Sequence, residues 1–158
     1  MGIKLPPMHH IAIAVEDIAT AAQFYTSAFG MQWFPERETY IEQAFWKGEH
    51  CPFKVKVLYG DMQGVRVELV QTVEGKTTDL EFLNTRGQGV SHIGYDVSDL
   101  KATLDELAQH GITVITQGVA QSGTPFAFVD MGGVYAEFVQ RPEGDFAAAL
   151  AGKPEPHK

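Results

Sequence analysis

The sequence predicts an α+β fold in which two βαβββ modules are paired and their curved, mixed sheets face each other across a cleft. Three observations support this prediction. The chain has 158 residues and is 44% hydrophobic, which suits one compact domain or two small modules that share a core. His10-Ile-Ala-Ile-Ala-Val-Glu-Asp17 recurs as His92-Ile-Gly-Tyr-Asp-Val-Ser-Asp99. Val67-Glu-Leu-Val-Gln71 likewise recurs as Ala136-Glu-Phe-Val-Gln140, so the two halves are related modules.

The first half is predicted to begin with a strand followed by a helix. Residues 9–15 alternate as a strand does, and Glu16 and Asp17 then open an amphipathic helical pattern that ends at Gly30. Further apolar segments predict three more strands, the first two separated by the charged stretch 35–50 and the last two joined in a hairpin. These strands are expected at about 31–39, 53–59 and 65–71.

The second half repeats this order. A strand at 90–97 leads into a helix near 99–110, and residues 79–86 suggest a short connecting helix before them. Three strands then follow, near 112–117, 125–130 and 134–140. We therefore predict a single domain over residues 1–141, with modules at about 8–72 and 89–141. The tail, 142–158, has no strand pattern, and we expect a fraying helix and a mobile end there.

The charge and the cysteine count exclude several classes of protein. There are 12 Lys and Arg against 20 Asp and Glu, a formal net charge of −8, and no basic run offsets it. Such a chain repels phosphate backbones and anionic lipid, so we expect neither a nucleic-acid nor a membrane partner. Cys51 is the single cysteine, which excludes an intrachain disulfide. With no secretory or membrane-spanning pattern, we expect a soluble cytoplasmic protein.

Alternation along the repeated strands places four ionisable residues on one face. Alternate side chains of a strand share a face, and the apolar set is expected to turn toward the helices. Ile11, Ile13 and Val15 form that set in the first strand, which leaves His10 on the opposite face. The same parity turns Glu68, His92 and Glu137 away from the helices, so each module supplies one histidine and one glutamate.

If the two sheets face each other, these four side chains converge on a metal site. Two imidazoles and two carboxylates suit one divalent ion (Zn, Ni, Co, Mn, Mg or Fe) that keeps two positions open for water or substrate. A lone strand histidine is more often a structural residue, but the matched pattern in both repeats favours ligands. The other histidines fall on the opposite face or in polar and terminal segments, and we interpret them as surface residues: His9, His50, His110 and His157.

At these residues the chain resembles the vicinal oxygen chelate superfamily, nearest its methylmalonyl-CoA epimerase and glyoxalase I branches. The resemblance covers about residues 8–141. It implies His10, Glu68, His92 and Glu137 as metal ligands and a small-molecule carbonyl substrate that loses a proton next to its carbonyl. The resemblance also implies that Glu137 is the base, and that the protein forms a homodimer. Epimerases of this type commonly carry His-Pro-Lys before the final strand, whereas this chain runs Phe128-Val-Asp-Met-Gly-Gly133-Val-Tyr, a departure that speaks against a CoA thioester.

Further residues are candidates for catalysis and substrate binding. By parity Lys54 and Lys56 share the cleft face, where Lys56 could act as a base and Lys54 could bind substrate; alternatively both are solvated lysines of an edge strand. Arg66 and Tyr135 lie two residues from Glu68 and Glu137 and are candidate substrate contacts, although Arg66 could equally pair with a carboxylate. Aromatic residues could wall a pocket or simply pack in the core: Trp33, Phe34, Phe45, Trp46 and Phe53.

These features predict a metal-dependent epimerase, isomerase or lyase, and two other functions stay open. An extradiol-type dioxygenase usually uses two histidines and one glutamate, so a fourth ligand at Glu68 speaks against it. A metal-free binding or resistance protein has no need of four matched ligands.

Overall fold

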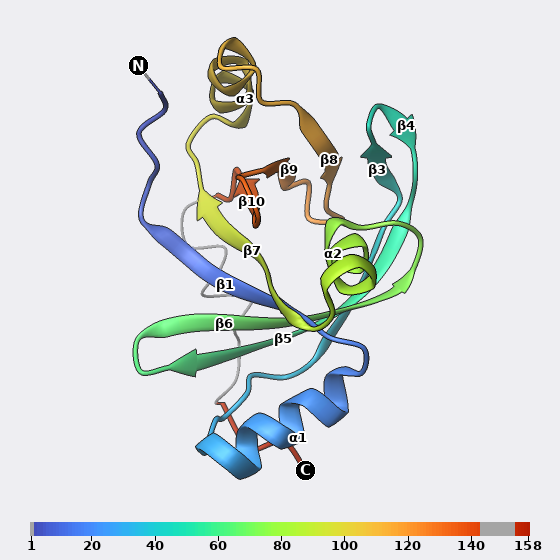
Figure 1. Cartoon of the computed structure of the whole chain (residues 1–158), viewed down its shortest axis with the longest axis vertical. Coiled ribbons are helices and arrows are strands. Elements are labelled where there is room, and N and C mark those ends of the chain that lie inside the picture. The colour runs from blue at the N-terminus through green and yellow to red at the C-terminus, as the bar shows by residue number, and fades with distance from the viewer. Residues whose placement is uncertain (1, 143–153) are drawn as a thin grey trace.

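The computed structural model describes residues 2–142 and 154–158, and its ten strands form one mixed sheet that curls into a half-barrel (Figure 1). The bounds of the elements, in chain order, are β1 Met8–Ala14, α1 Ile18–Phe29, β2 Arg37–Ile41, β3 Gln43–Trp46, β4 Glu49–His50, β5 Phe53–Met62, β6 Val65–Glu74, α2 Thr78–Arg86, β7 Gly89–Asp96, α3 Leu100–Gln109, β8 Val114–Val119, β9 Pro125–Asp130 and β10 Tyr135–Val139.

The strand order confirms the paired βαβββ modules. Across the sheet the order is β2-β5-β6-β1-β7-β10-β9-β8-β3-β4. The first module contributes β2-β5-β6-β1 and the second contributes the mirrored series β7-β10-β9-β8. Within each module the first strand pairs in parallel with the last, β1 with β6 and β7 with β10. The modules join where β1 and β7 pair antiparallel at the centre of the sheet.

The segment around residues 31–50 differs from the prediction. The strand expected at 31–39 begins at Arg37, and the charged stretch contains two further strands, β3 and β4. Ile41, Ala44 and Trp46 are buried while the residues between them are exposed, a weak alternation that the high charge of the segment obscures. β3 pairs with β8 of the other module. Because only Glu42 separates β2 at one end of the sheet from β3 near the other, the sheet must curl.

Helices α1 and α3 cover the outer face of the sheet, as predicted. Asp17 caps α1 by accepting a hydrogen bond from the Thr20 N–H, and Gly30 ends the helix at a φ of 68°. Ile18, Ala21 and Ala22 then pack against β5 and β6 in one core cluster, and α3 packs in an equivalent cluster of the second module. Figure 1 shows the two helices at opposite ends of the molecule. The concave face is left for other side chains.

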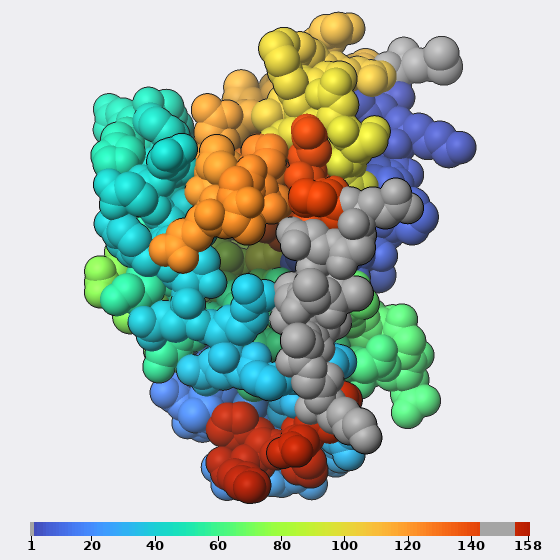
Figure 2. Space-filling view, turned by 180° about the vertical axis from the view of Figure 1, so that it is seen from behind, coloured from blue at the N-terminus to red at the C-terminus, as the bar shows by residue number. Residues whose placement is uncertain are grey.

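The described end of the tail packs on the first module. Residues 143–153, on which the predicted fraying helix falls, lie outside the described residues. Glu155 forms an isolated bridge with Trp33, and the His157 N–H donates to the Thr26 hydroxyl of α1. Figure 2 shows residues 154–158 against the first module at that end of the molecule. The mobile end stays a prediction, while His157, interpreted as a surface residue, is half-buried.

Candidate metal centre

The register of the central strands brings the two histidines and two glutamates together. Ala12 of β1 pairs with Glu68 on one side and His92 on the other. Gly94 of β7 likewise lies between His10 and Glu137. Each histidine is thus separated from a glutamate of the other module by one small residue. The predicted parity of these four residues is therefore correct.

Two nitrogen atoms and one oxygen atom lie close enough together to bind one metal ion. The Nε2 atoms of His10 and His92 are 3.1 Å apart, and Glu137 Oε2 lies 3.3 Å from the first and 3.6 Å from the second. The three candidate ligand atoms all lie within 4.8 Å of one another. Glu68 adjoins this group through His10, with its Oε2 3.5 Å from His10 Nε2. Both histidines are buried.

Gly94 makes room for the imidazole of His10. A Cβ built at this position would lie 2.0 Å from His10 Cε1 and 2.3 Å from Nδ1. Non-bonded heavy atoms do not approach each other so closely, so any larger residue at position 94 would displace the imidazole ring of His10. The absence of a side chain at Gly94 therefore gives the histidine ring its space.

A carboxylate that the sequence prediction missed holds His92. His92 Nδ1 donates to Asp79 Oδ1 at 2.8 Å, and the hydroxyl of Ser91 donates to the same oxygen at 2.6 Å. A shift in the β1–β7 register leaves Ser91 as the extra residue of a bulge, so Ser91 and His92 both reach Asp79. Burial alone would lower the pKa of His92, but the charge and hydrogen bond of Asp79 raise it to about 9.

His10 has a different partner, because its neighbour His9 is also turned inward. The register shifts between Met8 and His10, which makes His9 a bulged residue and puts its Nδ1 2.8 Å from His10 Nδ1. Burial, together with His10 and two nearby arginines, lowers the pKa of His9 to about 3. Our interpretation of His9 as a surface residue is therefore wrong, since a bulge interrupts the alternation on which it rested.

Two guanidinium groups lie behind His9. Arg66 Nη1 is 3.0 Å from His9 Nε2 and Arg141 Nη1 is 3.4 Å from it. Arg141 also pairs with Asp96. Arg66 does share the face of Glu68, as predicted, but its contact is with His9 rather than with the cavity wall described below. The first module's ligand His10 is therefore backed by a second imidazole with two guanidinium groups beyond it, whereas His92 is backed by the carboxylate of Asp79 from the linker helix α2.

The two glutamates of the group differ in proton affinity. Burial would raise the pKa of Glu137, but the hydrogen bond from His10 and the charge of His92 lower it to about 2. Burial dominates at Glu68 and raises its pKa, although the two histidines and a hydrogen bond from Tyr59 oppose this. Glu137 is thus the carboxylate that stays ionised, and Glu68 is the one that more readily holds a proton.

A cavity of about 420 Å³ opens beside this group on the concave face of the sheet. His92, Glu68, Asp79 and Glu137 lie on its wall at one side. The remaining wall is divided equally between apolar side chains and arginine or hydroxyl side chains: Arg37, Thr39, Ile41, Phe53, Val55, Val57, Tyr59, Val70, Thr77, Thr78, Thr116, Ala120, Ser122, Thr124, Phe126, Phe128, Val139 and Arg141.

Lys54 and Lys56 do not reach this cavity, so their predicted placement is wrong. Val55, Val57 and Tyr59 line the wall instead. Lys54 Nζ lies 3.1 Å from Glu74, and Lys56 Nζ lies 3.9 Å from Glu36. The prediction assumed that the apolar face of a strand turns toward a helix, but on β5 the apolar residues line a cavity.

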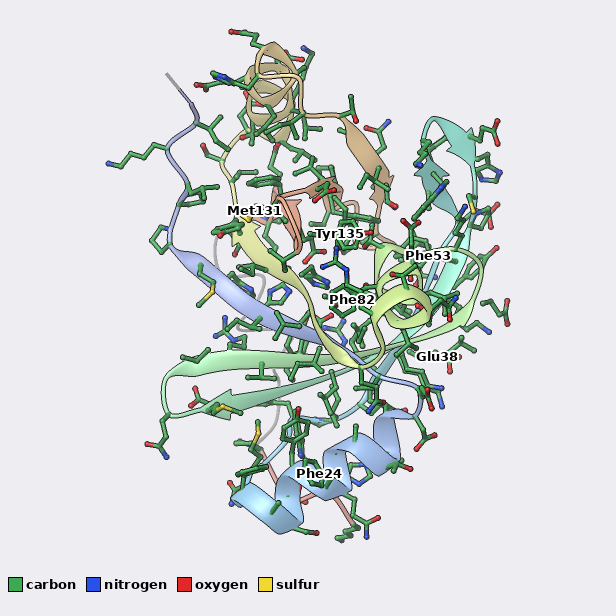
Figure 3. All side chains as sticks on the ribbon, in the orientation of Figure 1. Phe24, Glu38, Phe53, Phe82, Met131 and Tyr135 are labelled. Atoms are coloured by element: carbon green, nitrogen blue, oxygen red, sulfur yellow. The ribbon has the colours of Figure 1, made fainter. Side chains whose placement is uncertain are left out.

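Of the remaining candidates, only Phe53 lies on the cavity wall. The Tyr135 hydroxyl donates to Glu81 of α2 at 3.4 Å, away from the cavity wall, and Figure 3 shows the Tyr135 side chain beside the inner strands. Among the aromatic candidates Phe53 lines the cavity, while Trp33 and Trp46 are buried core residues and Phe45 is partly exposed. In the sequence, the only signal for the position of Asp79 is that it follows Thr77, a residue type typical of helix N-caps, and so falls in the first turn of a helix.

The donor set fits a divalent cation. Asp79 accepts the Nδ1 proton of His92, which leaves the Nε2 lone pair of the neutral ring directed at the group. Two imidazoles and a carboxylate, with a second carboxylate adjoining, bring negative charge and lone pairs together without an arginine or lysine among them. A divalent ion would neutralise this charge, and imidazole with carboxylate suits the first-row metals.

Comparison with known proteins shows the family of this chain. Residues 9–128 match the model of the Glyoxalase/Bleomycin resistance protein/Dioxygenase superfamily, so the chain belongs to this superfamily. The uncharacterised protein YqjC of Bacillus subtilis (strain 168) is 29% identical over 143 residues, covering 87% of this chain and 94% of that protein. The mitochondrial methylmalonyl-CoA epimerase of Homo sapiens is 27% identical over 143 residues, covering 87% and 75%.

Solved structures share the fold. The crystal structure of methylmalonyl-CoA epimerase from Mycobacterium tuberculosis superposes with a TM-score of 0.62 at 22% identity, covering 91% of this chain and 93% of that one.

None of the helices in the described residues is long and apolar enough to cross a membrane.

Proposed function

We propose that the protein is a divalent-metal-dependent epimerase, isomerase or lyase that removes a proton from the carbon next to a carbonyl group. The observation that supports this best is the convergence of His10, His92 and Glu137 at the edge of a cavity. An ion held there would polarise the carbonyl and stabilise the negative charge that develops as the proton leaves. The similarity to methylmalonyl-CoA epimerases supports the same class of reaction.

Within this proposal the two carboxylates have separate roles. Glu137 has a lowered pKa and lines the cavity, so it is ionised and can accept the proton from the substrate. Glu68 lies on the other module and has a raised pKa, so it can return a proton. In the described residues the only other carboxylate on the cavity wall is Asp79, which already accepts from His92 and Ser91. Two carboxylates with separated pKa values are the usual arrangement for acid–base pairs.

A metal-free binding or resistance protein is a second candidate, which the apolar part of the cavity wall favours. It predicts that a small apolar molecule binds equally well with and without a chelator.

The homodimer and the cytoplasmic location stay predictions, as does the identity of the metal.

Metal analysis combined with solvent exchange tests the proposal. The protein is loaded separately with Mn²⁺, Co²⁺, Ni²⁺, Zn²⁺ or Fe²⁺ and incubated in D₂O with α-hydroxy ketones, acyl-CoA thioesters or hemithioacetals. We expect one class to acquire deuterium at the carbon next to its carbonyl. His92→Ala should lose the metal, and Glu137→Gln should lower exchange by about a hundredfold or more, a typical loss for a general base. Failure to bind any of these ions would exclude the proposal.

A further inference from the structure

The two modules place an aromatic ring in equivalent positions beside the candidate metal centre. In the first module Tyr59 of β5 lies directly across from Glu68 of β6. In the second module Phe128 of β9 lies directly across from Glu137 of β10. Each ring also packs edge-on against the histidine of its own module, with ring centroids 6.1 Å apart in the first and 5.1 Å apart in the second. The repeat therefore offers an internal comparison between the two aromatic residues.

The two aromatic residues differ by one hydroxyl group. The hydroxyl of Tyr59 donates a hydrogen bond to the Glu68 carboxylate. Phe128 has no hydroxyl and so offers Glu137 no such bond. Tyr59 and Glu68 both line the cavity, and Glu68 is only 5% exposed. A hydrogen bond to a buried carboxylate is stronger than one between neutral groups, so it restrains the position of that carboxylate.

The two glutamates also differ in their positions relative to the candidate ligand atoms. Glu137 Oε2 lies 3.3 Å from His10 Nε2 and 3.6 Å from His92 Nε2. Glu68 Oε2 lies 3.5 Å from His10 Nε2. Among the described residues, however, Glu68 is not part of the set whose ligand atoms all lie within 4.8 Å of one another, which consists of the two histidines and Glu137. The glutamate that accepts from a hydroxyl is thus the one that lies apart.

We propose that Tyr59 is a positioning residue whose hydroxyl holds the Glu68 carboxylate beside the metal ion rather than on it, so that the two histidines and Glu137 are the protein ligands. This differs from the four-ligand set that the resemblance implies, and it rests on the proposed function for the presence of the ion. A six-coordinate ion then keeps three positions open rather than two. Glu68 stays a free carboxylate next to them, which can exchange a proton with a substrate.

The number of water molecules bound to the ion tests this assignment in the full-length protein. Relaxation of water protons by the Mn²⁺-loaded protein measures that number, and titration calorimetry measures the affinity for Mn²⁺. We expect about three bound waters in the parent and about two in Tyr59→Phe, because the released Glu68 carboxylate takes one position. The affinity should rise about tenfold or more in this variant, since a hydrogen bond to a charged group no longer competes with the ion.

Two further variants separate ligation from folding. Glu68→Leu should leave the number of bound waters unchanged in the parent. It should lower the affinity for Mn²⁺ about tenfold more in the Tyr59→Phe background than in the parent, because only there is the carboxylate a ligand. The matched control Tyr135→Phe removes a hydroxyl that bonds Glu81 away from the cavity wall, so it should match the parent in both measurements.

Two results would overturn the assignment. About two bound waters in the parent, with one more in Glu68→Leu, would mean that Glu68 is already a ligand. An unchanged water number and affinity in Tyr59→Phe would mean that the hydroxyl does not position the carboxylate. Phenylalanine keeps the ring that packs against His10, so a purely structural role of Tyr59 predicts this second result.

The same proteins distinguish this inference from the proposed function. If the water numbers change as expected but no carbonyl compound exchanges deuterium with any metal, the assignment of Tyr59 stands and the proposed reaction fails. If deuterium exchange occurs and Tyr59→Phe binds as many waters as the parent, the proposed reaction stands and the assignment fails. Failure to bind any ion would overturn both.

Discussion

The two modules supply nearly symmetric halves of the metal centre but surround them very differently. His10 and His92 occupy equivalent strands, and each lies across a small residue from a glutamate of the other module. Behind His92 lies the Asp79 carboxylate, 2.8 Å from Nδ1. Behind His10 lies a second imidazole, His9, which two guanidinium groups approach from the far side.

This difference shows which half of the site holds its ligand by charge. A carboxylate that accepts from an imidazole orients the ring and increases its basicity, and the raised pKa of His92 reflects this. His9 has a strongly lowered pKa, so it contacts His10 as a neutral group. We infer that His92, the ligand of the second module, is held electrostatically by Asp79 of the linker helix, whereas His10, the ligand of the first module, is held by packing against Gly94 of β7.

Gly94→Ala should have the largest effect of the substitutions outside the ligands. The new Cβ would lie 2.0 Å from His10 Cε1, so the ring must leave its position and the first module loses its ligand. We expect metal affinity to fall by about a hundredfold or more, the upper end of losses caused by changes around a ligand. Calorimetric titration with Mn²⁺ or Co²⁺ measures this.

Gly89→Ala in the same strand is the matched control. A Cβ there would meet Phe82 at 3.5 Å, an ordinary contact, so metal affinity should match that of the parent. Equal affinities for the Gly94 and Gly89 variants would contradict the role assigned to Gly94.

Asp79→Asn and His9→Gln compare the two sides directly. Removing the carboxylate should weaken metal binding by about ten- to a hundredfold, as is usual for the partner of a ligating histidine, whereas replacing the neutral His9 should cost less. In the parent, His92 must release a proton to bind the ion, so affinity should rise as the pH increases from about 7 to 9. In Asp79→Asn the pKa of His92 falls and this rise should flatten.

The pH dependence of folding gives a second readout of Asp79 in the metal-free protein. Because the folded pKa of His92 lies above the unfolded value of 6.5, its contribution to stability is complete below pH 6.5 and is lost as the pH rises through about 9. Thermal melts in EDTA should show this loss in the parent and much less of it in Asp79→Asn. The same loss in both proteins would mean that Asp79 does not raise this pKa.

Lys56→Ala should have the smallest effect. Its ammonium group pairs only loosely with Glu36 at 3.9 Å on the face away from the cavity, and surface pairs of this kind contribute under about 1 kcal/mol. Metal affinity and deuterium exchange should stay within about twofold of the parent in the assays above. A large loss of exchange would instead favour the base that the sequence pattern suggested.

The sequence alone was enough to predict the paired modules and the four residues at the centre. Internal repetition revealed the two halves, and the period of two along β1, β6, β7 and β10 set the faces of His10, Glu68, His92 and Glu137. Such predictions succeed because alternation is a local property of an extended backbone. They failed at His9, where a bulge adds one residue, and at Lys54 and Lys56, where the apolar face of β5 lines a cavity.

Only the tertiary structure decided what stands behind each ligand. Asp79 reaches His92 from a helix in the linker between modules, and β3 crosses to pair with β8 of the second module. Neither contact is encoded by a local period, since both depend on how distant segments pack. Thus the sequence determined the faces of the four central side chains, because alternation along a strand is local. Packing determined which charged groups and rings lie next to them.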